Sequence, residues 1–245
     1  MTKICLLGFG GMGQAVEKAA RERKHEVVIV DPSHESAEYK NIREVDLSTV
    51  DVVIDVSSGA AVLDNVKACV EAGVNVVVGS TGWYEKMEEV KGVLNGSEIG
   101  FMWSSNFSIG VNMYFKIVEA AAKLANKFDE YDVWGHEIHH YNKADSPSGT
   151  AKTLEKILLE NIERKTAVVE DKLDRKPEPN ELHFSSLRAG AVNFAHTIGF
   201  DSAADKILIT HEARSRDGYG VGAVKAAEWL VGKKGWFGME DFLNF

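Results

Sequence analysis

The stretch KICLLGFGGMG, residues 3–13, decides the fold. Ile4 to Leu7 form a short apolar run typical of a buried strand, and a glycine-rich turn follows at once. Residues 14–22 continue as a predicted helix. A strand, a G-x-G-x-x-G turn and a helix in this order are the dinucleotide-binding fingerprint, in which glycines let a pyrophosphate approach the helix N-terminus. The residues predicted to bind the dinucleotide here are Gly8, Phe9, Gly10, Gly11, Met12 and Gly13.

A second apolar run, HEVVIVD, ends in Asp31. This residue follows Gly13 by 18 positions, close to the roughly 20 expected for the acid that binds the ribose hydroxyls. An acid at this point disfavours a 2′-phosphate, and no arginine follows to offset it. We therefore predict NADH as the preferred cofactor, with NADPH use possible. The competing interpretation makes Asp31 a turn former before Pro32.

Strands and helices then alternate along the chain. Strands are predicted at 51–56, 75–78 and 99–103, and helices at 60–72 and 84–94. This alternation predicts an α/β fold with a Rossmann-type, doubly wound parallel sheet, whose ligands lie at the carboxyl ends of the strands. Small polar residues follow two of these ends and are predicted to contact ribose and nicotinamide: Gly79, Ser80, Thr81, Ser104, Ser105 and Asn106. Such residues are also common in any turn of this kind.

The pattern changes after residue 106. We expect a long helix over 109–126, a strand over 130–139, a charged loop over 165–181, and strands at 183–189, 191–200 and 205–213. Residues 214–220 are interpreted as a break before an apolar helix and a tail. This part is predicted to be a second α+β domain with a mixed or antiparallel sheet and helices to one side.

Proton-active side chains gather in HEIHHYNKADSPSGT, residues 136–150. His139, His140 and Lys143 lie within five residues, and the segment then enters a predicted helix. Ser146 or Ser148 can cap this helix, Pro147 is tolerated in its first turn, and the free amides there attract an anion such as a carboxylate. The three side chains can bind the same anion and can donate protons near neutral pH. In the structural alternative, the histidines pair with backbone groups and the serine is only a cap.

The same letters contain H-E-x-x-H, a zinc hydrolase signature, at His136, Glu137 and His140. That motif needs a helix, whereas residues 130–139 are rich in aromatic and β-branched residues and indicate a strand. On a strand, His139 shares a face with Glu137 and lies opposite His136. We therefore predict no metal site.

Composition limits the remaining function classes. The chain has 245 residues, 44% hydrophobic and 27% charged content, and a net charge of −9. This charge argues against nucleic acid as a partner, and no apolar run is long enough to cross a membrane. The two cysteines, Cys5 and Cys69, lie in apolar context and are expected to be reduced and buried. With no recognisable signal peptide, a cytoplasmic location is expected.

Taken together, these motifs resemble the 4-hydroxy-tetrahydrodipicolinate reductase family, also called dihydrodipicolinate reductases, of the diaminopimelate route to lysine. The resemblance runs nearly end to end: GFGGMG, VVVGSTGW, SSNFSIGVN, EIHHYNKADSPSGTA, LRAGAVNFAHTIGF and ITHEARSR followed by GAVKAAEWL. It implies reduction of a cyclic imine dicarboxylate by hydride transfer from NAD(P)H. A related reductase of another imino or keto acid, or a non-catalytic NADH-binding redox sensor, would share much of this pattern.

The resemblance also implies roles and boundaries. His139 matches the proton donor or acceptor, Lys143 the proton donor and His140 a substrate contact, while Gly149 and Thr150 supply amides to a carboxylate. Phe107 joins the preceding turn in the cofactor site. Residues 1–106 and 217–245 match the dinucleotide-binding domain, and 107–216 the substrate-binding and oligomerisation domain of a homotetramer.

Four positions depart from the usual family pattern. Gly11 replaces an arginine, which removes a cation near the cofactor phosphates, and Trp103 stands where a small residue is common. Asn193-Phe194 replace a glycine-led pair. The loss of the arginine at Gly11 further favours NADH, and Trp103 puts the shape of the nicotinamide pocket in question.

Overall fold

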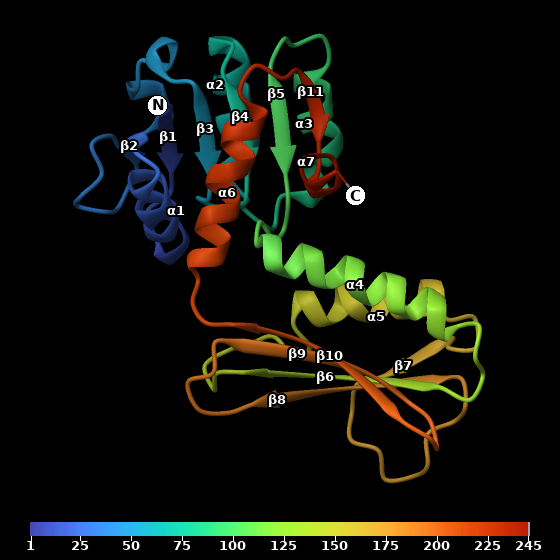
Figure 1. Cartoon of the computed structure of the whole chain (residues 1–245). Coiled ribbons are helices and arrows are strands. Elements are labelled where there is room, and N and C mark those ends of the chain that lie inside the picture. Colours follow the sequence, from blue (N-terminus) through green and yellow to red (C-terminus); the bar gives the residue numbers. More distant parts are fainter. Residues whose placement is uncertain (245) are drawn as a thin grey trace. The chain divides into compact units, whose positions relative to one another are not determined.

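The computed structural model describes residues 1–244 and divides the chain into two compact units. The first unit combines Met1–Ile109 with Arg216–Phe245, of which residue 245 lies outside the described part, and the second is Gly110–Ser215. The chain therefore leaves the first unit once and returns to it near the end (Figure 1). The sequence placed these changes after residues 106 and 216.

The first unit contains a six-stranded sheet in the order β11-β5-β4-β3-β1-β2, in which every neighbouring pair is parallel. Its strands are β1 (Lys3–Leu7), β2 (Glu26–Val30), β3 (Val52–Asp55), β4 (Asn75–Val78), β5 (Gly100–Trp103) and β11 (Gly235–Phe237). Its main helices are α1 (Gly11–Glu22), α2 (Val62–Ala72), α3 (Met87–Leu94), α6 (Asp217–Leu230) and the short α7 (Met239–Leu243). Helices cover both faces, which confirms the doubly wound parallel sheet (Figure 1).

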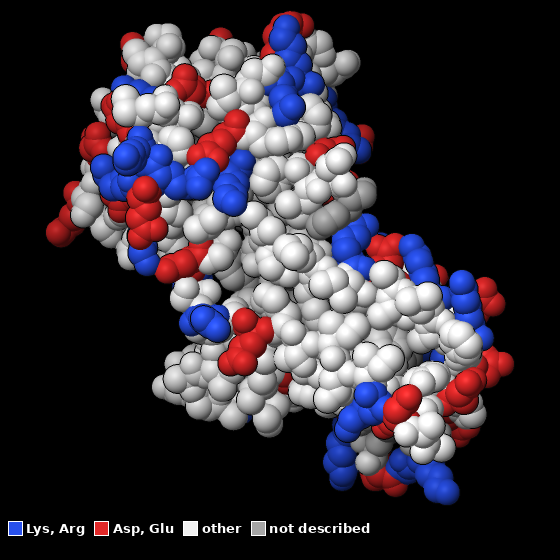
Figure 2. All heavy atoms as spheres, in the orientation of Figure 1, with Lys and Arg blue, Asp and Glu red and all other residues white. Residues whose placement is uncertain are grey.

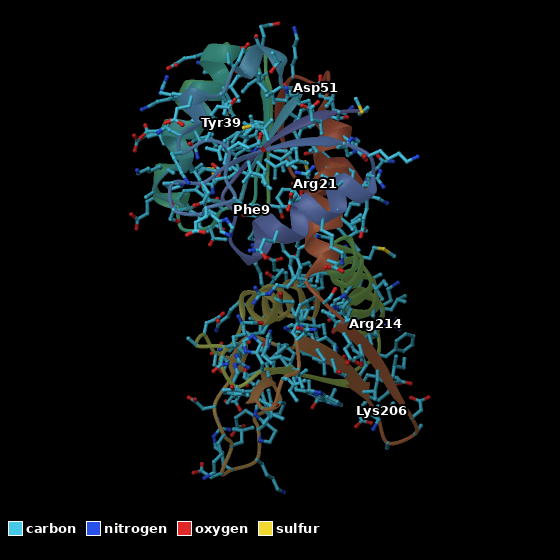
Figure 3. All side chains as sticks on the ribbon, turned by 90° about the vertical axis from the view of Figure 1, so that its left-hand side faces the viewer. Phe9, Arg21, Tyr39, Asp51, Lys206 and Arg214 are labelled. Carbon is cyan, nitrogen blue, oxygen red and sulfur yellow. The ribbon has the colours of Figure 1, made fainter. Side chains whose placement is uncertain are left out.

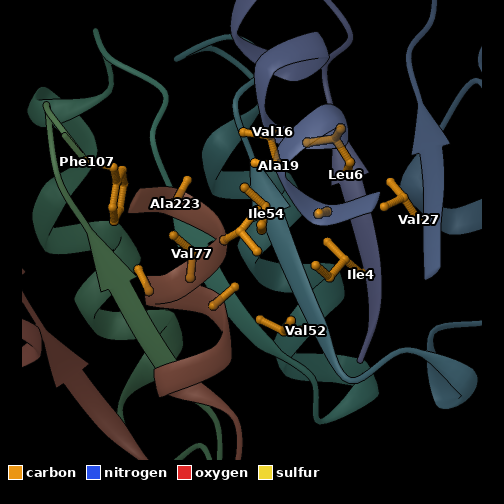
Figure 4. Close-up of a cluster of buried hydrophobic side chains, with 14 of the residues drawn as sticks. Ile4, Leu6, Val16, Ala19, Val27, Val52, Ile54, Val77, Phe107 and Ala223 are labelled. Atoms are coloured by element: carbon orange, nitrogen blue, oxygen red, sulfur yellow. The ribbon is translucent and has the colours of Figure 1, made fainter. Parts of the chain in front are cut away.

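Alternate residues of the central strands supply the two cores of this unit. Ile4, Leu6 and Ile54 pack toward α1 and α6, as the close-up in Figure 4 shows, and Cys5 and Val53 belong to the core on the α2 side. Strands buried on both faces have continuous apolar sequences, and β1 to β4 follow this rule. Both cysteines are free and buried, as predicted.

The end of the chain differs from the prediction. Residues 214–220 were interpreted as a break, but α6 already begins at Asp217. The tail also supplies β11, which pairs with β5 as an edge strand of the parallel sheet. Three residues with one tryptophan and one phenylalanine carry too little periodicity to indicate a strand without the neighbour they pair with.

The second unit is a five-stranded mixed sheet in the order β10-β9-β6-β8-β7. Its strands are β6 (Asp132–His139), β7 (Ala167–Val169), β8 (Glu181–Arg188), β9 (Phe194–Asp201) and β10 (Lys206–Ala213). The helices α4 (Ile109–Ala125) and α5 (Gly149–Asn161) lie on one face, as expected (Figure 1). Strand β7 lies inside the segment predicted as a charged loop, and this part of the prediction is wrong.

Charged side chains of both signs are interspersed over the face of the molecule shown in Figure 2, beside a broad uncharged area on the second unit. Several apolar side chains on that unit are more than 45% exposed: Met113, Ile117 and Leu124 on α4, and Ile207 and Leu208 on β10. None of the helices among residues 1–244 is both long and apolar enough to span a bilayer.

Candidate active site

The glycine turn between β1 and α1 is as tight as the fingerprint requires. Gly8 has φ +90°, and a Cβ built on it would lie 2.6 Å from the Cα of Ser57. A Cβ on Gly13 would lie 2.1 Å from the Gly8 carbonyl oxygen, so both positions exclude any side chain. Gly10 caps α1 without a side-chain hydrogen bond, which leaves the first amides of this helix free to bind an anion.

Asp31 lies at the end of β2 and holds this turn in place. One carboxylate oxygen accepts the Phe9 amide at 2.8 Å, and the other accepts the Ser33 amide and hydroxyl and the His34 amide. Burial raises the pKa of Asp31, but these hydrogen bonds outweigh it and lower the pKa to about 2. The carboxylate is therefore ionised. It also forms the turn after β2, as the competing interpretation of Asp31 expected. Phe9, whose ring is buried, contributes its backbone to the turn.

The second and third turns lie at the same edge of the sheet, because they follow β4 and β5. The buried Ser80 hydroxyl donates to the Asp55 carboxylate at 2.9 Å, so this side chain joins neighbouring strand ends. Its carbonyl accepts the Trp83 indole N–H at 2.9 Å. Thr81 is exposed, and a Cβ built on Gly79 would lie 3.6 Å from the Phe107 ring.

In the third turn, the Ser104 hydroxyl donates to the carbonyl of Asn106 and accepts the Asn106 amide. Ser105 is exposed and Phe107 is buried. Trp103, which precedes this turn, packs against Trp83 at 5.7 Å and Tyr84 at 5.5 Å between ring centroids. Trp103, which stands where a small residue is common in the family, is thus part of an aromatic cluster on the α2–α3 side of the sheet.

In the second unit, the alternation along β6 decides which side chains meet. Glu137 and His139 are buried on the face that carries α5, as their spacing predicted. His136 lies on the other face and stacks on Trp134, with ring centroids 5.8 Å apart. The helix that H-E-x-x-H needs is absent from this segment, which confirms the strand.

Glu137 is the centre of a buried hydrogen-bond network that the sequence did not reveal. Its carboxylate accepts the Arg188 guanidinium at 2.8 Å, the Ser186 hydroxyl at 2.9 Å and the Ser148 amide at 3.1 Å. The Ser148 hydroxyl and the His196 Nε2 contact its second oxygen. Burial raises the pKa of Glu137, but its hydrogen bonds outweigh this effect and hold the pKa well below the ordinary value. One carboxylate therefore joins β6, β8, β9 and the start of α5.

Ser148 is the N-cap of α5, and its hydroxyl accepts the Ala151 amide. Pro147 therefore precedes the cap instead of entering the first turn, and Ser146 is not the cap. Gly149 is exposed, with nothing within 4 Å of the position of a Cβ, and Thr150 is half-buried. These first residues of the helix present amides at an open N-terminus, the arrangement that suits a carboxylate.

His139 lies beside this network. Its side chain is 7% exposed, its Nδ1 lies 3.5 Å from Glu137 Oε2, and its ring stacks on Phe194 with centroids 5.8 Å apart. Burial lowers its pKa to about 4; the Glu137 charge opposes this, and His196, Lys143 and Arg188 reinforce it. His139 is therefore neutral at pH 7 and can act as a proton acceptor or as an N–H donor. Phe194, one of the departures from the family pattern, forms part of the wall of this site.

Lys143 follows in the loop between β6 and α5. Its ammonium contacts the Asp145 carboxylate at 2.7 Å, and its amide donates to the His140 carbonyl. Arg188 donates to the Asp145 carbonyl, so the network around Glu137 also holds this loop. The structure thus brings His139, Lys143 and the start of α5 together, and His140 lies half-buried on the loop that joins them.

Three groups within this cluster also have the spacing of a metal site. Ligand atoms of Glu137, His139 and His196 lie within 4.8 Å of one another, and all three residues are buried. Hydrogen bonds from Ser148, Ser186 and Arg188 already satisfy the carboxylate, and the guanidinium charge would repel a cation. The donor set therefore does not favour a metal.

Comparison with known proteins shows the family of the chain. Two family models match the chain: "Dihydrodipicolinate reductase, N-terminus" over residues 2–107 and "Dihydrodipicolinate reductase, C-terminus" over residues 110–243. A 4-hydroxy-tetrahydrodipicolinate reductase of Christiangramia forsetii is 36% identical over 98% of this chain and 97% of its own. One of Archaeoglobus fulgidus is 38% identical over 82% of this chain and 79% of its own.

Solved structures show the same fold. The dipicolinate-bound dihydrodipicolinate reductase of Paenisporosarcina sp. TG-14 has a TM-score of 0.78, with 20% identity and 97% coverage of both chains. An aspartate dehydrogenase of Thermotoga maritima has a TM-score of 0.52 with 13% identity, covering 95% of this chain and 98% of its own. The two family models together span nearly the whole chain, and it belongs to the dihydrodipicolinate reductase family.

Proposed function

We propose that this chain reduces 4-hydroxy-tetrahydrodipicolinate, or the dihydrodipicolinate derived from it, to tetrahydrodipicolinate with hydride from NADH or NADPH. This is the reductive step of the diaminopimelate route to lysine. The observation that carries the proposal is the cluster at residues 137–150, where a neutral imidazole and an ammonium group lie beside the open N-terminus of α5. A cyclic imine dicarboxylate needs both an anion site and a proton source, and this cluster offers both.

The residues divide these tasks between them. The Gly149 and Thr150 amides bind a substrate carboxylate, with His140 and Lys143 beside it. Hydride adds to the conjugated ring, and the electron pair displaced from the double bond takes a proton from the enzyme. Cations near the developing negative charge lower the barrier, a role that suits the Lys143 ammonium. His139 or Lys143 supplies the proton.

The cofactor occupies the glycine turn and the turns after β4 and β5. We propose contacts from the predicted set: Gly8 to Gly13, Asp31, Gly79 to Thr81 and Ser104 to Phe107. The ionised Asp31 supports NADH over NADPH, because a 2′-phosphate would meet a like charge. Its four protein hydrogen bonds mean that the ribose hydroxyls would donate to a carboxylate already fixed in orientation.

We further propose that the protein acts in the cytoplasm as a homotetramer built through the second unit. The exposed apolar side chains of α4 and β10 support this assembly, since exposed apolar groups concentrated on one unit are typical of a surface that another protein covers. No nucleic acid or membrane partner is proposed.

A coupled assay tests the activity. Freshly generated substrate and either NADH or NADPH are mixed with the enzyme, and nucleotide loss is followed by absorbance. The proposal expects rapid loss with a higher kcat/KM for NADH. Nucleotide binding without turnover of this substrate would instead favour a related reductase or a redox sensor.

A further inference from the structure

Two glycines let the start of α6 pack closely against α1 and the turn after β5. A Cβ on Gly220 would lie 2.3 Å from the Ala15 carbonyl oxygen of α1, and a Cβ on Gly222 would lie 1.8 Å from the Phe107 carbonyl oxygen. Backbone therefore packs directly on backbone at both points. The ion pair between Lys18 and Asp217 also joins α1 to α6. The first turn of α6 has a fixed position against the glycine turn and the turn after β5.

This packing brings Arg216, the N-cap residue of α6, to the start of α1. Its Nη1 lies 2.8 Å from the position that a Cβ on Gly11 would take, and Gly11 is the first residue of α1. The guanidinium has no hydrogen bond or ion pair with residues 1–244 in the structure, although it is close enough to Tyr219 to affect the pKa of that phenol. Arg216, which is far from the glycine fingerprint in the sequence, thus places a positive charge without an ion-pair partner among residues 1–244 beside it.

We infer that Arg216 is a cofactor-binding residue whose guanidinium contacts the pyrophosphate of the bound dinucleotide. The inference rests on the proposed function. A pyrophosphate bound by this fingerprint lies at the N-terminus of α1, where the guanidinium lies, and arginine pairs with phosphate oxygens through two parallel N–H donors. On a chain of net charge −9, such a local cation offsets the general repulsion of an anionic cofactor.

The inference also gives a reason for Gly11. A side chain at this position would meet Arg216, so glycine leaves the space into which the guanidinium extends. The cation that the fingerprint lacks in its own loop is supplied from α6. Because the pyrophosphate is common to both nucleotides, this contact stabilises NADH and NADPH equally and leaves their discrimination to the ribose end.

Dissociation constants of NADH and NADPH, measured by calorimetry on the full-length protein, test this assignment. Arg216→Ala should raise the dissociation constants of both nucleotides by about tenfold. This change corresponds to the lower part of the range for a hydrogen bond to a charged group, as expected at an exposed site. Arg216→Lys should lose less. Arg21→Ala makes the same charge change at the other end of α1, where Arg21 pairs with Glu17, and should bind both nucleotides as the wild type does (Figure 3).

A double variant that moves the arginine from position 216 to position 11 provides the decisive test. The double variant Gly11→Arg with Arg216→Ala removes the collision and returns a guanidinium to the start of α1, so it should recover most of the lost affinity. Thermal unfolding of each variant establishes that it is folded.

Three results would overturn the inference: unchanged affinity in Arg216→Ala, a loss confined to NADPH, or a double variant that binds no better than Arg216→Ala. A wild type that binds neither nucleotide would instead refute the proposed function itself.

Discussion

Replacing Glu137 by glutamine should destabilise the second unit in a pH-dependent way. The substitution keeps the shape of the side chain but removes the charge that faces Arg188, and it puts an NH2 group among donors from Ser148, Ser186 and His196. Breaking a buried ion pair by removing one partner costs about 3–5 kcal/mol. Because the Arg188 side chain keeps 17% of its exposure, we expect the lower end, about 3 kcal/mol at neutral pH.

The pH dependence follows from the lowered pKa of Glu137. A carboxyl whose pKa is depressed by folding contributes stability above its unfolded-state pKa, here 4.5, and loses that contribution as the pH falls toward its folded-state pKa. The difference in unfolding free energy between wild type and Glu137→Gln should therefore be full at neutral pH and shrink steadily below about pH 4.5.

Urea unfolding of both proteins at neutral and acidic pH measures this difference. Glu119→Gln is the matched control, since Glu119 pairs with Lys116 and Lys123 on the outside of α4 and its loss should cost much less. Glu137→Gln should also raise the KM for the imine more than the dissociation constant for NADH, because Ser148 and the start of α5 lose their hydrogen-bond partner. A cost below about 1 kcal/mol, or one that does not change with pH, would refute the role given to Glu137.

The remaining predictions concern the proton-active groups and the glycine turn. Lys143→Ala and His139→Gln should each lower kcat by about a hundredfold or more if the residue transfers the proton, and steady-state NADH loss measures this; a variant with near-normal turnover removes its residue from that role. Gly13→Ala forces a Cβ to within 2.1 Å of the Gly8 carbonyl and should lower the unfolding free energy by about 1–3 kcal/mol. Gly92→Ala on α3, where nothing lies within 4 Å, should raise it by about 0.5–1 kcal/mol, and the opposite order in thermal unfolding would contradict the packing described for the turn.

Much of the fold can be predicted from the sequence, because the parallel strands are buried on both faces. Val52 to Asp55 and Asn75 to Val78 appear as short apolar runs between amphipathic helices, and each is a strand of the observed sheet. The period of two along β6 also placed His139 with Glu137 and separated both from His136. Both features depend only on the order of residues within one short segment.

What the sequence did not reveal depends on contacts between distant segments. Glu137 meets Ser148, Arg188 and His196 only because three strands and a helix start converge, and no short motif contains all four. An acidic residue at a buried strand position was the one available signal, since such a charge needs partners. Arg216 was hidden for a further reason: the expected break over residues 214–220 removed it from the helix that brings it to Gly11.

Transfer of deuterium from 4-deuterated NADH tests the central claim most directly. With freshly generated substrate and the wild-type enzyme, mass spectrometry of the product should find one deuterium on a ring carbon of tetrahydrodipicolinate for each NADH consumed, using the stereoisomer of the cofactor from which the enzyme takes its hydride. If neither stereoisomer of the labelled cofactor gives labelled tetrahydrodipicolinate, the enzyme does not catalyse this hydride transfer, and the account is wrong.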